Sequence, residues 1–224
     1  MKSDIKTYFV LPYRDRFGKY KKALNEFIHP FKEYLNSQNK NYDIIIVERS
    51  EKYDLFNLGQ TINIGFDIFK KNMNENDIFI FHPVDILPKT VNYFINKTTK
   101  FCSLEHSKDG TFYKAMGFLV SDYLKLNGYT NKFWGWGAED DEMMARLNIA
   151  NININVSIDE YLKLCDDGNG TEEHQHFMPT FDRNHQIVNE LKQTKNLYYS
   201  GLNDLNYKIL EESEYLGVKK YLVE

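Results

Sequence analysis

The first 81 residues alternate between short apolar runs and longer segments with helical spacing, and this alternation restricts the fold more than any other feature. Residues 8–11, 42–47 and 77–81 are apolar runs typical of buried strands. Residues 17–36 and 56–70 place apolar side chains three and four positions apart, which predicts amphipathic helices. Strand, helix, strand, helix, strand with short joins predicts a parallel sheet covered by helices, in the order of a nucleotide-binding half.

Length, charge and cysteine content limit the class of protein. A chain of 224 residues is long enough for one domain with a sizeable core, and its net charge of −4 predicts no affinity for nucleic acid. Cys102 and Cys165 lie far apart and outside metal-ligand spacing, so no disulfide scaffold is expected. No apolar run has the length of a signal peptide core or a membrane span. We therefore expect no transmembrane segment and a cytoplasmic location, with at most peripheral contact to a membrane.

Residues 133–142 form the one stretch that folding alone does not explain. Trp134 and Trp136 alternate with glycines, and four carboxylates follow almost directly. Acidic residues favour the first turn of a helix and tryptophans commonly fill cores, so a purely structural role is the general expectation. The glycines around Trp136 nevertheless make a poor core strand, because glycine packs nothing and costs backbone entropy. This composition favours a loop that changes shape over a ligand and leads into an acidic helix at residues 139–150.

Other charged residues follow the predicted strands, where open α/β sheets bind ligands. Arg14 and Arg16 come after the first strand, although surface arginines give the same pattern. Asp85 follows the third strand, where it can hold a metal on a diphosphate or simply form a turn. His174 and His176 are two apart in a segment expected to be extended, so both rings can reach one metal, although such pairs are more often surface residues.

The aromatic and acidic stretch resembles a known signature. Residues 134–141 are similar to the pattern Trp-Gly-Trp-Gly-x-Glu-Asp-Asp of the β-1,4-galactosyltransferase family. Shorter segments at 12–16, 56–66, 83–88 and 201–203 also resemble that family, so the similarity extends from about residue 8 to about residue 210. The resemblance implies an α/β fold of the GT-A nucleotide-sugar-binding type, with a mainly parallel central sheet and helices on both faces. It implies one glycosyltransferase domain over residues 1–224, with a nucleotide-binding half at about 1–90 and an acceptor and catalytic half at about 91–210.

The resemblance also assigns roles to matching residues. Asp140 corresponds to the catalytic base. The positions that bind a UDP-sugar donor are Pro12, Arg14, Arg16, Phe56, Val84, Asp85 and Trp136. The positions that bind the acceptor are Trp136, Gly137, Glu139, Asp141 and Phe181. The metal positions are Asp85, His174 and His176, which match the Mn²⁺ site of family members that add galactose to xylose on protein; another divalent cation would also suit this donor set.

The implied activity is metal-dependent, inverting transfer of a hexose from a UDP-sugar to a hydroxyl of a glycan or glycolipid acceptor. Galactose is the expected sugar. Leu58 replaces a family arginine and Pro83 a family aspartate at the nucleotide site, while Thr180 and Asn184 replace residues that flank an N-acetyl pocket. The two changes at the nucleotide site keep UDP-N-acetylgalactosamine and UDP-glucose open as donors, whereas Thr180 and Asn184 argue against an N-acetylglucosamine acceptor. The two changes also keep open a nucleotide-sugar or glycan-binding protein without transfer activity.

Overall fold

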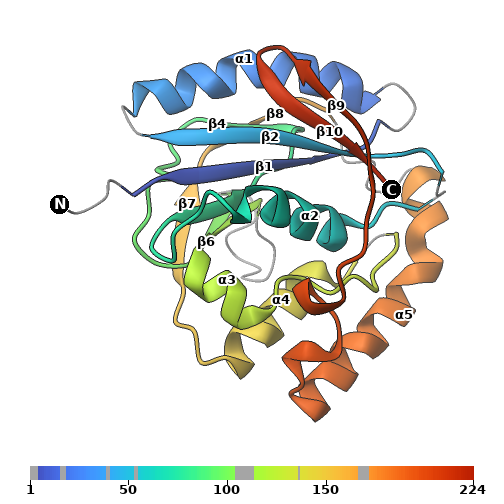
Figure 1. Ribbon diagram of the computed structural model, residues 1–224. Coiled ribbons are helices and arrows are strands. Elements are labelled where there is room, and N and C mark those ends of the chain that lie inside the picture. The colour runs from blue at the N-terminus through green and yellow to red at the C-terminus, as the bar shows by residue number, and fades with distance from the viewer. Residues whose placement is uncertain are drawn as a thin grey trace.

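An eight-stranded mixed sheet forms the centre of the molecule, with helices on both of its faces (Figure 1). The computed structural model describes residues 5–15, 19–38, 41–52, 55–103, 114–135, 137–165 and 172–224, with the backbone alone at residues 19 and 172–179. The strands are β1 (Thr7–Tyr13), β2 (Tyr42–Arg49), β3 (Ile78–Phe81), β4 (Ile86–Pro88), β5 (Thr99–Ser103), β6 (Ala115–Leu119), β7 (Asn155–Asp159), β8 (Tyr161–Lys163), β9 (Ile209–Tyr215) and β10 (Val218–Val223). The helices are α1 (Lys19–Ser37), α2 (Leu58–Lys70), α3 (Val120–Leu126), α4 (Glu139–Ile149) and α5 (Glu172–Thr194).

The strand order is β7-β5-β6-β3-β1-β2-β10-β9, and β4 and β8 form a separate two-stranded sheet. β1 pairs in parallel with β2 and β3, β2 with β10, and β5 with β7. β6 and β9 run antiparallel to their neighbours. Because parallel strands end at the same edge, the segments that follow β1 and β3 leave the sheet next to each other. The expected α/β fold with a mainly parallel sheet is confirmed.

Two hydrophobic cores cover the two faces of β1, because successive side chains of a strand point to opposite sides. Phe9 and Leu11 pack with Phe27 and other residues of α1. Val10 packs on the opposite face with residues of α2, α3 and α4. Helix α2 approaches this face closely, since a Cβ atom at Gly65 would lie 2.5 Å from both Val10 methyl groups. β1 is therefore held from both sides, and its carboxyl end is a firm support for a ligand site.

The structure corrects the sequence prediction in two places in the middle of the chain. The sequence of residues 112–121 predicts one strand, but β6 ends at Leu119 and α3 begins at Val120. The buried residues of α3 are Val120, Tyr123 and Leu126, which are three positions apart, as in a helix. In a run this short, the apolar pattern does not distinguish a helix from a strand. The sequence of residues 152–156 also predicts a short strand, but the strand in this region, β7, begins later, at Asn155.

The C-terminal tail is more integrated than predicted. We expected residues 211–224 to form a charged peripheral edge. β9 is indeed the edge strand of the large sheet. β10 lies inside the sheet and pairs with β2, and its residues Val218, Tyr221 and Val223 are buried. Within the described part of the chain, no helix is both long and apolar enough to cross a bilayer.

Candidate active site

Two adjoining cavities lie at the carboxyl ends of β1 and β3, beside the start of α4. Their volumes are about 290 Å³ and about 180 Å³. Both are lined by Pro12, Leu58, Pro83, Asp85 and Glu139. The first also includes Phe81, Ile86, Lys114, Tyr129 and Asp140, and the second Tyr13, Arg14, Tyr20, Phe56, Val84 and Gly135. Carboxylates from the strand-end loop and from α4 therefore line both cavities, beside the cation of Lys114 in the first and that of Arg14 in the second.

A turn with positive backbone φ angles sets the start of α4. Gly137 has φ 102° and Ala138, the residue before the helix, has φ 75°. Glycine is required at position 137 because a Cβ there would lie 2.7 Å from the Phe181 ring, in a conformation that other residues rarely adopt. Glu139, Asp140, Asp141 and Glu142 then fill the first turn, where carboxylates meet the positive end of the helix. The predicted acidic helix start is confirmed.

Glu139 titrates near neutral pH. Its side chain is half-buried, and this burial raises the pKa of Glu139 to about 7. Hydrogen bonds from the backbone N–H groups of Glu139 and Gly137 act in the opposite direction, and the charge of Glu142 adds to the increase. The carboxyl group of Glu139, which lines both cavities, therefore titrates at a higher pH than that of an exposed glutamate.

Replacing Glu139 by glutamine should change how stability depends on pH. A carboxyl group whose folded-state pKa is raised binds its proton more tightly in the native state, so stability decreases as pH increases through that range. From about pH 4.5 to about pH 7, the free energy of unfolding of the native chain should fall relative to that of Glu139→Gln, by at most about 3 kcal/mol. Urea denaturation at several pH values measures this. The exposed Glu190→Gln is the matched control, and identical profiles for both variants would contradict the assignment.

A buried ion pair anchors α4 below the cavity. Glu142 and Arg146 have no exposed side-chain surface, and Arg146 Nε donates a hydrogen bond to Glu142 Oε1. Arg146 also donates to the carbonyl oxygens of Leu126 at 2.8 Å, Leu197 at 3.0 Å and Ser200 at 2.7 Å. Helix α4 is therefore tied to α3 and to the segment after α5.

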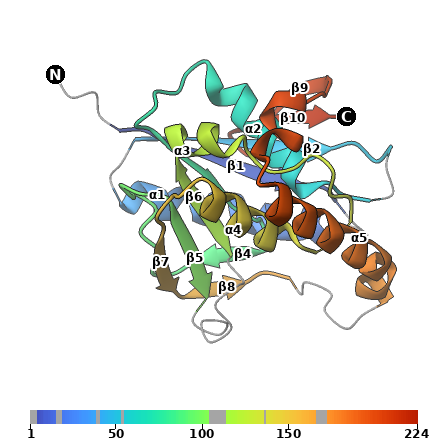
Figure 2. The same cartoon turned by 90° about the horizontal axis from the view of Figure 1, so that it is seen from below.

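Helix α5 packs beside α4 (Figure 2), and two of its residues contact the start of α4 and the turn before it. Asn184 Nδ2 donates to the carbonyl oxygen of Gly137 at 3.0 Å, and His185 Nε2 lies 3.3 Å from Asp141 Oδ2. The rings of Phe181 and His185 stand 4.1 Å apart between their centroids. Sequence reasoning assigned no role to Asn184 and His185, although their helical spacing from Phe181 places them on one face.

The predicted site residues are distributed as follows. Pro12, Arg14, Phe56, Val84 and Asp85 line the second cavity, Glu139 lines both and Asp140 the first. Asp141 and Phe181 lie beside them, at the contact with α5. Arg16 and Trp136 lie outside the described residues. Lys114, Tyr129 and Tyr20 were missed, because no motif distinguishes a single residue that comes from a distant segment.

The extended conformation predicted for His174 and His176 is wrong. Both residues belong to the first two turns of α5. Residues two apart in a helix point about 200° from each other, so the alternation that would bring both rings to one side does not apply. Glu172 and Glu173 explain the helix, since acidic residues favour a helix N-terminus. The side chains of both histidines lie outside the description, so their assignment as ligands stays a prediction.

The described carboxylates of the cavities offer oxygen ligands of the kind that hard divalent cations bind, but they do not form a metal site by themselves. Asp85 lines both cavities together with Glu139, and carboxylate oxygens are ligands that such cations prefer. Among the described side chains, no group of three or more His, Cys, Asp or Glu is arranged to hold a metal ion. Asp85 is thus the described residue on which a metal site would depend, and further ligands must come from other parts of the chain or from the substrate.

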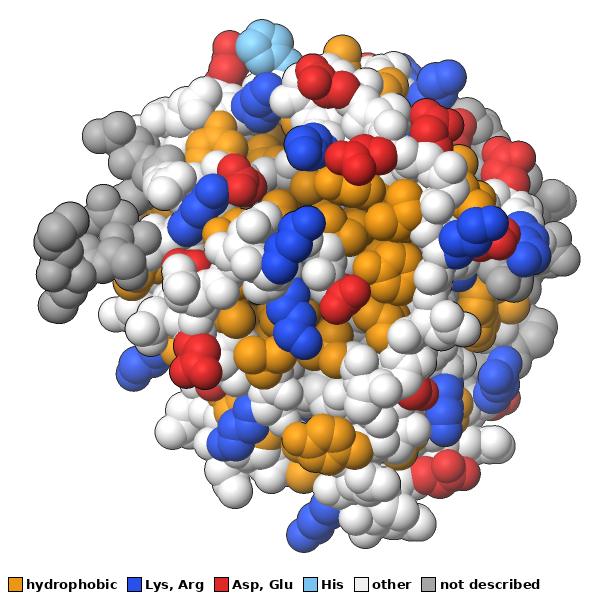
Figure 3. Space-filling model, viewed as in Figure 1, with side chains coloured by type: hydrophobic (Ala, Val, Ile, Leu, Met, Phe, Trp, Pro, Cys, Tyr) orange, Lys and Arg blue, Asp and Glu red, His pale blue; other side chains and the backbone are white. Residues whose placement is uncertain are grey.

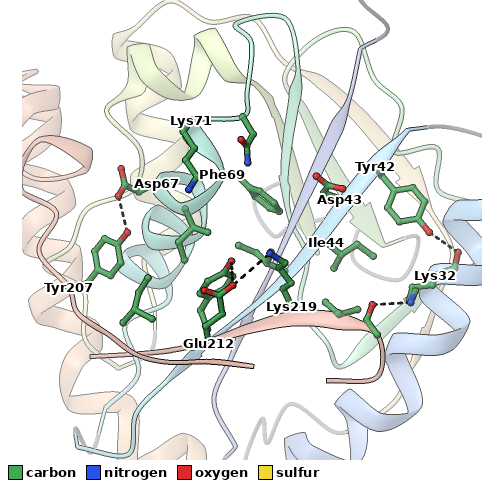
Figure 4. Close-up of a pocket in the computed structure, with 17 residues that line it drawn as sticks. Lys32, Tyr42, Asp43, Ile44, Asp67, Phe69, Lys71, Tyr207, Glu212 and Lys219 are labelled. Atoms are coloured by element: carbon green, nitrogen blue, oxygen red, sulfur yellow. Dashed lines mark hydrogen bonds and ion pairs between the residues drawn. The ribbon is translucent and has the colours of Figure 1, made fainter. Parts of the chain in front are cut away.

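A larger hollow of about 860 Å³ lies toward the amino ends of the parallel strands, around the first residues of β2 (Figure 4). Several polar groups there bind each other: Tyr207 donates to Asp67 at 2.9 Å, and Lys219 lies 3.7 Å from Glu212. The face shown in Figure 3 has lysine and arginine side chains interspersed with acidic ones, so it offers no field of one sign to steer a charged ligand. Because parallel sheets bind ligands at the carboxyl ends of their strands, the two smaller cavities are the candidate active site.

The fold is that of a GT-A glycosyltransferase, with cavities at the carboxyl ends of its parallel strands. Two family profiles match the chain: the N-terminal region of glycosyl transferase group 7 over residues 2–96, and the N-terminal domain of galactosyltransferase over residues 102–163. Together they span more than two thirds of the sequence. The chain belongs to the β-1,4-galactosyltransferase family.

Individual relatives agree with this assignment. Xylosylprotein 4-beta-galactosyltransferase of Caenorhabditis elegans is 29% identical over 214 residues, which cover 89% of this chain and 70% of the relative. Beta-1,4-galactosyltransferase 2 of Mus musculus is 26% identical over 91% of this chain, which spans 55% of that relative. Among solved structures, the catalytic domain of Drosophila β-1,4-galactosyltransferase 7 in complex with xylobiose superimposes with a TM-score of 0.71 at 20% identity, covering 98% of this chain and 93% of that one. A variant of that domain in complex with manganese, UDP-Gal and xylobiose has a TM-score of 0.69 at 19% identity, with the same coverage.

Proposed function

We propose that the chain transfers galactose from UDP-galactose to a hydroxyl group of a glycan, with inversion at the anomeric carbon and with help from a divalent cation. One observation supports this most: Asp85, from the loop after β3, and Glu139 and Asp140, from the start of α4, line one cavity at the carboxyl ends of β1 and β3. This is where the donor diphosphate and the acceptor hydroxyl would meet. The solved relative holds manganese, UDP-Gal and xylobiose.

In the proposed reaction, Asp140 accepts the proton of the acceptor hydroxyl. The acceptor oxygen forms a bond to the anomeric carbon while the bond from that carbon to the diphosphate oxygen breaks, so attack and departure occur on opposite faces. Glu139 and Asp141 orient the acceptor, and Arg14 and Lys114 place positive charge beside the departing diphosphate. A divalent cation bound at Asp85 would neutralise the remaining charge on the diphosphate.

The choice of donor sugar depends on two residues that differ from the family pattern at the nucleotide site. Leu58 and Pro83 line both cavities, so they replace charged family residues where the donor would bind. Lys114 supplies a cation in the first cavity, which partly offsets the missing arginine. This arrangement favours a functional donor site with altered contacts, and UDP-N-acetylgalactosamine or UDP-glucose is the second candidate donor.

A panel of UDP-sugars tests the proposal. The purified chain should release UDP from UDP-galactose faster than from UDP-N-acetylgalactosamine or UDP-glucose, and a xyloside or other glycan acceptor should increase the rate. Manganese should tighten UDP binding by about tenfold or more in calorimetry, and EDTA should abolish this gain. Faster release from another sugar would change the donor assignment. No release from any of them, with UDP still bound, would identify a binding protein.

Two variants test the metal ligands in the same assay. Asp85→Asn should remove the effect of manganese on UDP binding, because it removes the described carboxylate at the strand end. His176→Ala should weaken the effect if α5 supplies a ligand. An unchanged effect in His176→Ala would remove that histidine from the ligand set, and an unchanged effect in Asp85→Asn would overturn the metal site altogether.

A further inference from the structure

Asn184 is a polar side chain that is fully buried in the contact between α5 and the turn before α4. Its exposed fraction is 0%, and its Nδ2 donates to the carbonyl oxygen of Gly137 at 3.0 Å. Its Oδ1 is also buried and has no hydrogen-bond partner among the described residues. A buried amide reduces stability when one of its two polar groups has no hydrogen-bond partner. The hydrogen bond that Asn184 does make is therefore expected to have a role other than stabilising the fold.

The bond that Asn184 makes is to a turn that would not hold its shape unaided. Ala138 has φ 75°, a conformation that costs a residue with a side chain about 1–2 kcal/mol. Ala138 also provides no side-chain cap to α4, although its carbonyl oxygen accepts the first helical hydrogen bond, from Glu142 N at 2.9 Å. Such conformations persist only where contacts with neighbouring residues hold them in place. At this turn the surroundings are the Phe181 ring, packed on Gly137, and the Asn184 amide.

The position of this turn decides where two carboxylates of the cavity lie. Glu139 and Asp140 follow Ala138 directly and line the cavity together with Asp85. A small rotation at Gly137 or Ala138 would move both carboxylates relative to Asp85, which belongs to a different segment. Displacements of about 1 Å at a reacting group can reduce turnover a hundredfold.

We infer that Asn184 is a positioning residue, which fixes the Gly137–Ala138 turn and thereby the carboxylates of Glu139 and Asp140. Its effect on turnover rests on the proposed transferase function. Its effect on the order of the turn does not. The Asn184 side chain is bonded to the backbone of the Gly137–Ala138 turn, so it acts on the site through this turn.

Asn184→Leu tests this inference, because leucine has nearly the same size and removes both the donor and the unsatisfied Oδ1. We expect kcat for sugar transfer to fall by about five- to a hundredfold, the range for the loss of one buried hydrogen bond. The dissociation constant for UDP with manganese and the midpoint of urea denaturation should stay close to those of the native chain. Asn189→Leu, at an exposed position of α5, is the matched control and should leave all three quantities unchanged.

A second variant separates positioning from general damage. Glycine adopts positive φ angles without steric cost, so Ala138→Gly should restore several-fold of the kcat lost in Asn184→Leu. Hydrogen exchange followed by mass spectrometry gives a readout without activity: the amides of residues 137–142 should exchange faster in Asn184→Leu than in Asn189→Leu. Equal exchange in these two variants, or no gain from Ala138→Gly, would overturn the inference. If the native chain transfers no sugar, the proposed function fails, and the exchange comparison still decides the inference.

Discussion

Asp140→Asn should reduce sugar transfer by about a hundred- to ten-thousandfold while UDP binding in the presence of manganese stays within about twofold of the native value. The amide has the shape of the carboxylate but cannot accept the proton of the acceptor hydroxyl. Asp140 and Asp85 line one cavity but come from different segments, and asparagine keeps the size of the side chain, so the substitution should leave the donor site intact. Initial rates of UDP release with acceptor, together with calorimetric titration of UDP, measure the two effects.

The exposed Asp182→Asn on α5 is the matched control for this variant and should transfer sugar at the native rate. Asp141→Asn should have a smaller effect than Asp140→Asn, because Asp141 is engaged with His185 of α5. Turnover at the native rate in Asp140→Asn would show that another group is the base. Loss of UDP binding together with turnover would show that Asp140 belongs to the donor site.

Arg146→Met should destabilise the fold by about 3–5 kcal/mol, the usual cost of removing one partner of a buried ion pair. The substitution leaves the Glu142 carboxylate buried without its cation, and it also removes the donor for the carbonyl oxygens of Leu126, Leu197 and Ser200. Equilibrium denaturation in urea measures the change in free energy of unfolding. Turnover should fall with stability at assay temperature, since α4 carries Asp140.

Two further variants test whether the ion pair itself is the cause. Arg183→Met, at an exposed position of α5, should change stability by less than about 0.5 kcal/mol. The double variant Glu142→Leu with Arg146→Met should be more stable than Arg146→Met alone, because it removes the unpaired charge. A double variant no more stable than the single one would mean that the bonds to the three carbonyl groups account for the loss.

The local pattern of the sequence determined the α/β class, the first three strands and two helices, and the acidic start of α4. It could do so because apolar spacing repeats every two residues in a strand and every 3.6 in a helix, and because carboxylates favour the first turn. It also placed Asp85 and Arg14 at one edge, since parallel strands end together. The boundaries of β6, α3 and β7 were less well predicted, because a short apolar run fits either kind of element.

Tertiary contacts decided the rest of the site. Lys114 and Tyr129 reach the cavity from segments that no spacing relates to Asp85, and α5 brings Asn184 and His185 onto the turn at the start of α4. The sequence singled out the run of glycines, tryptophans and acids, but the conformation at Ala138 depends on a helix that begins more than thirty residues later. Local spacing determines which element forms. Which side chains come together in the site depends on how distant segments pack against each other. The energy of that packing cannot be read from the spacing of residues along the chain.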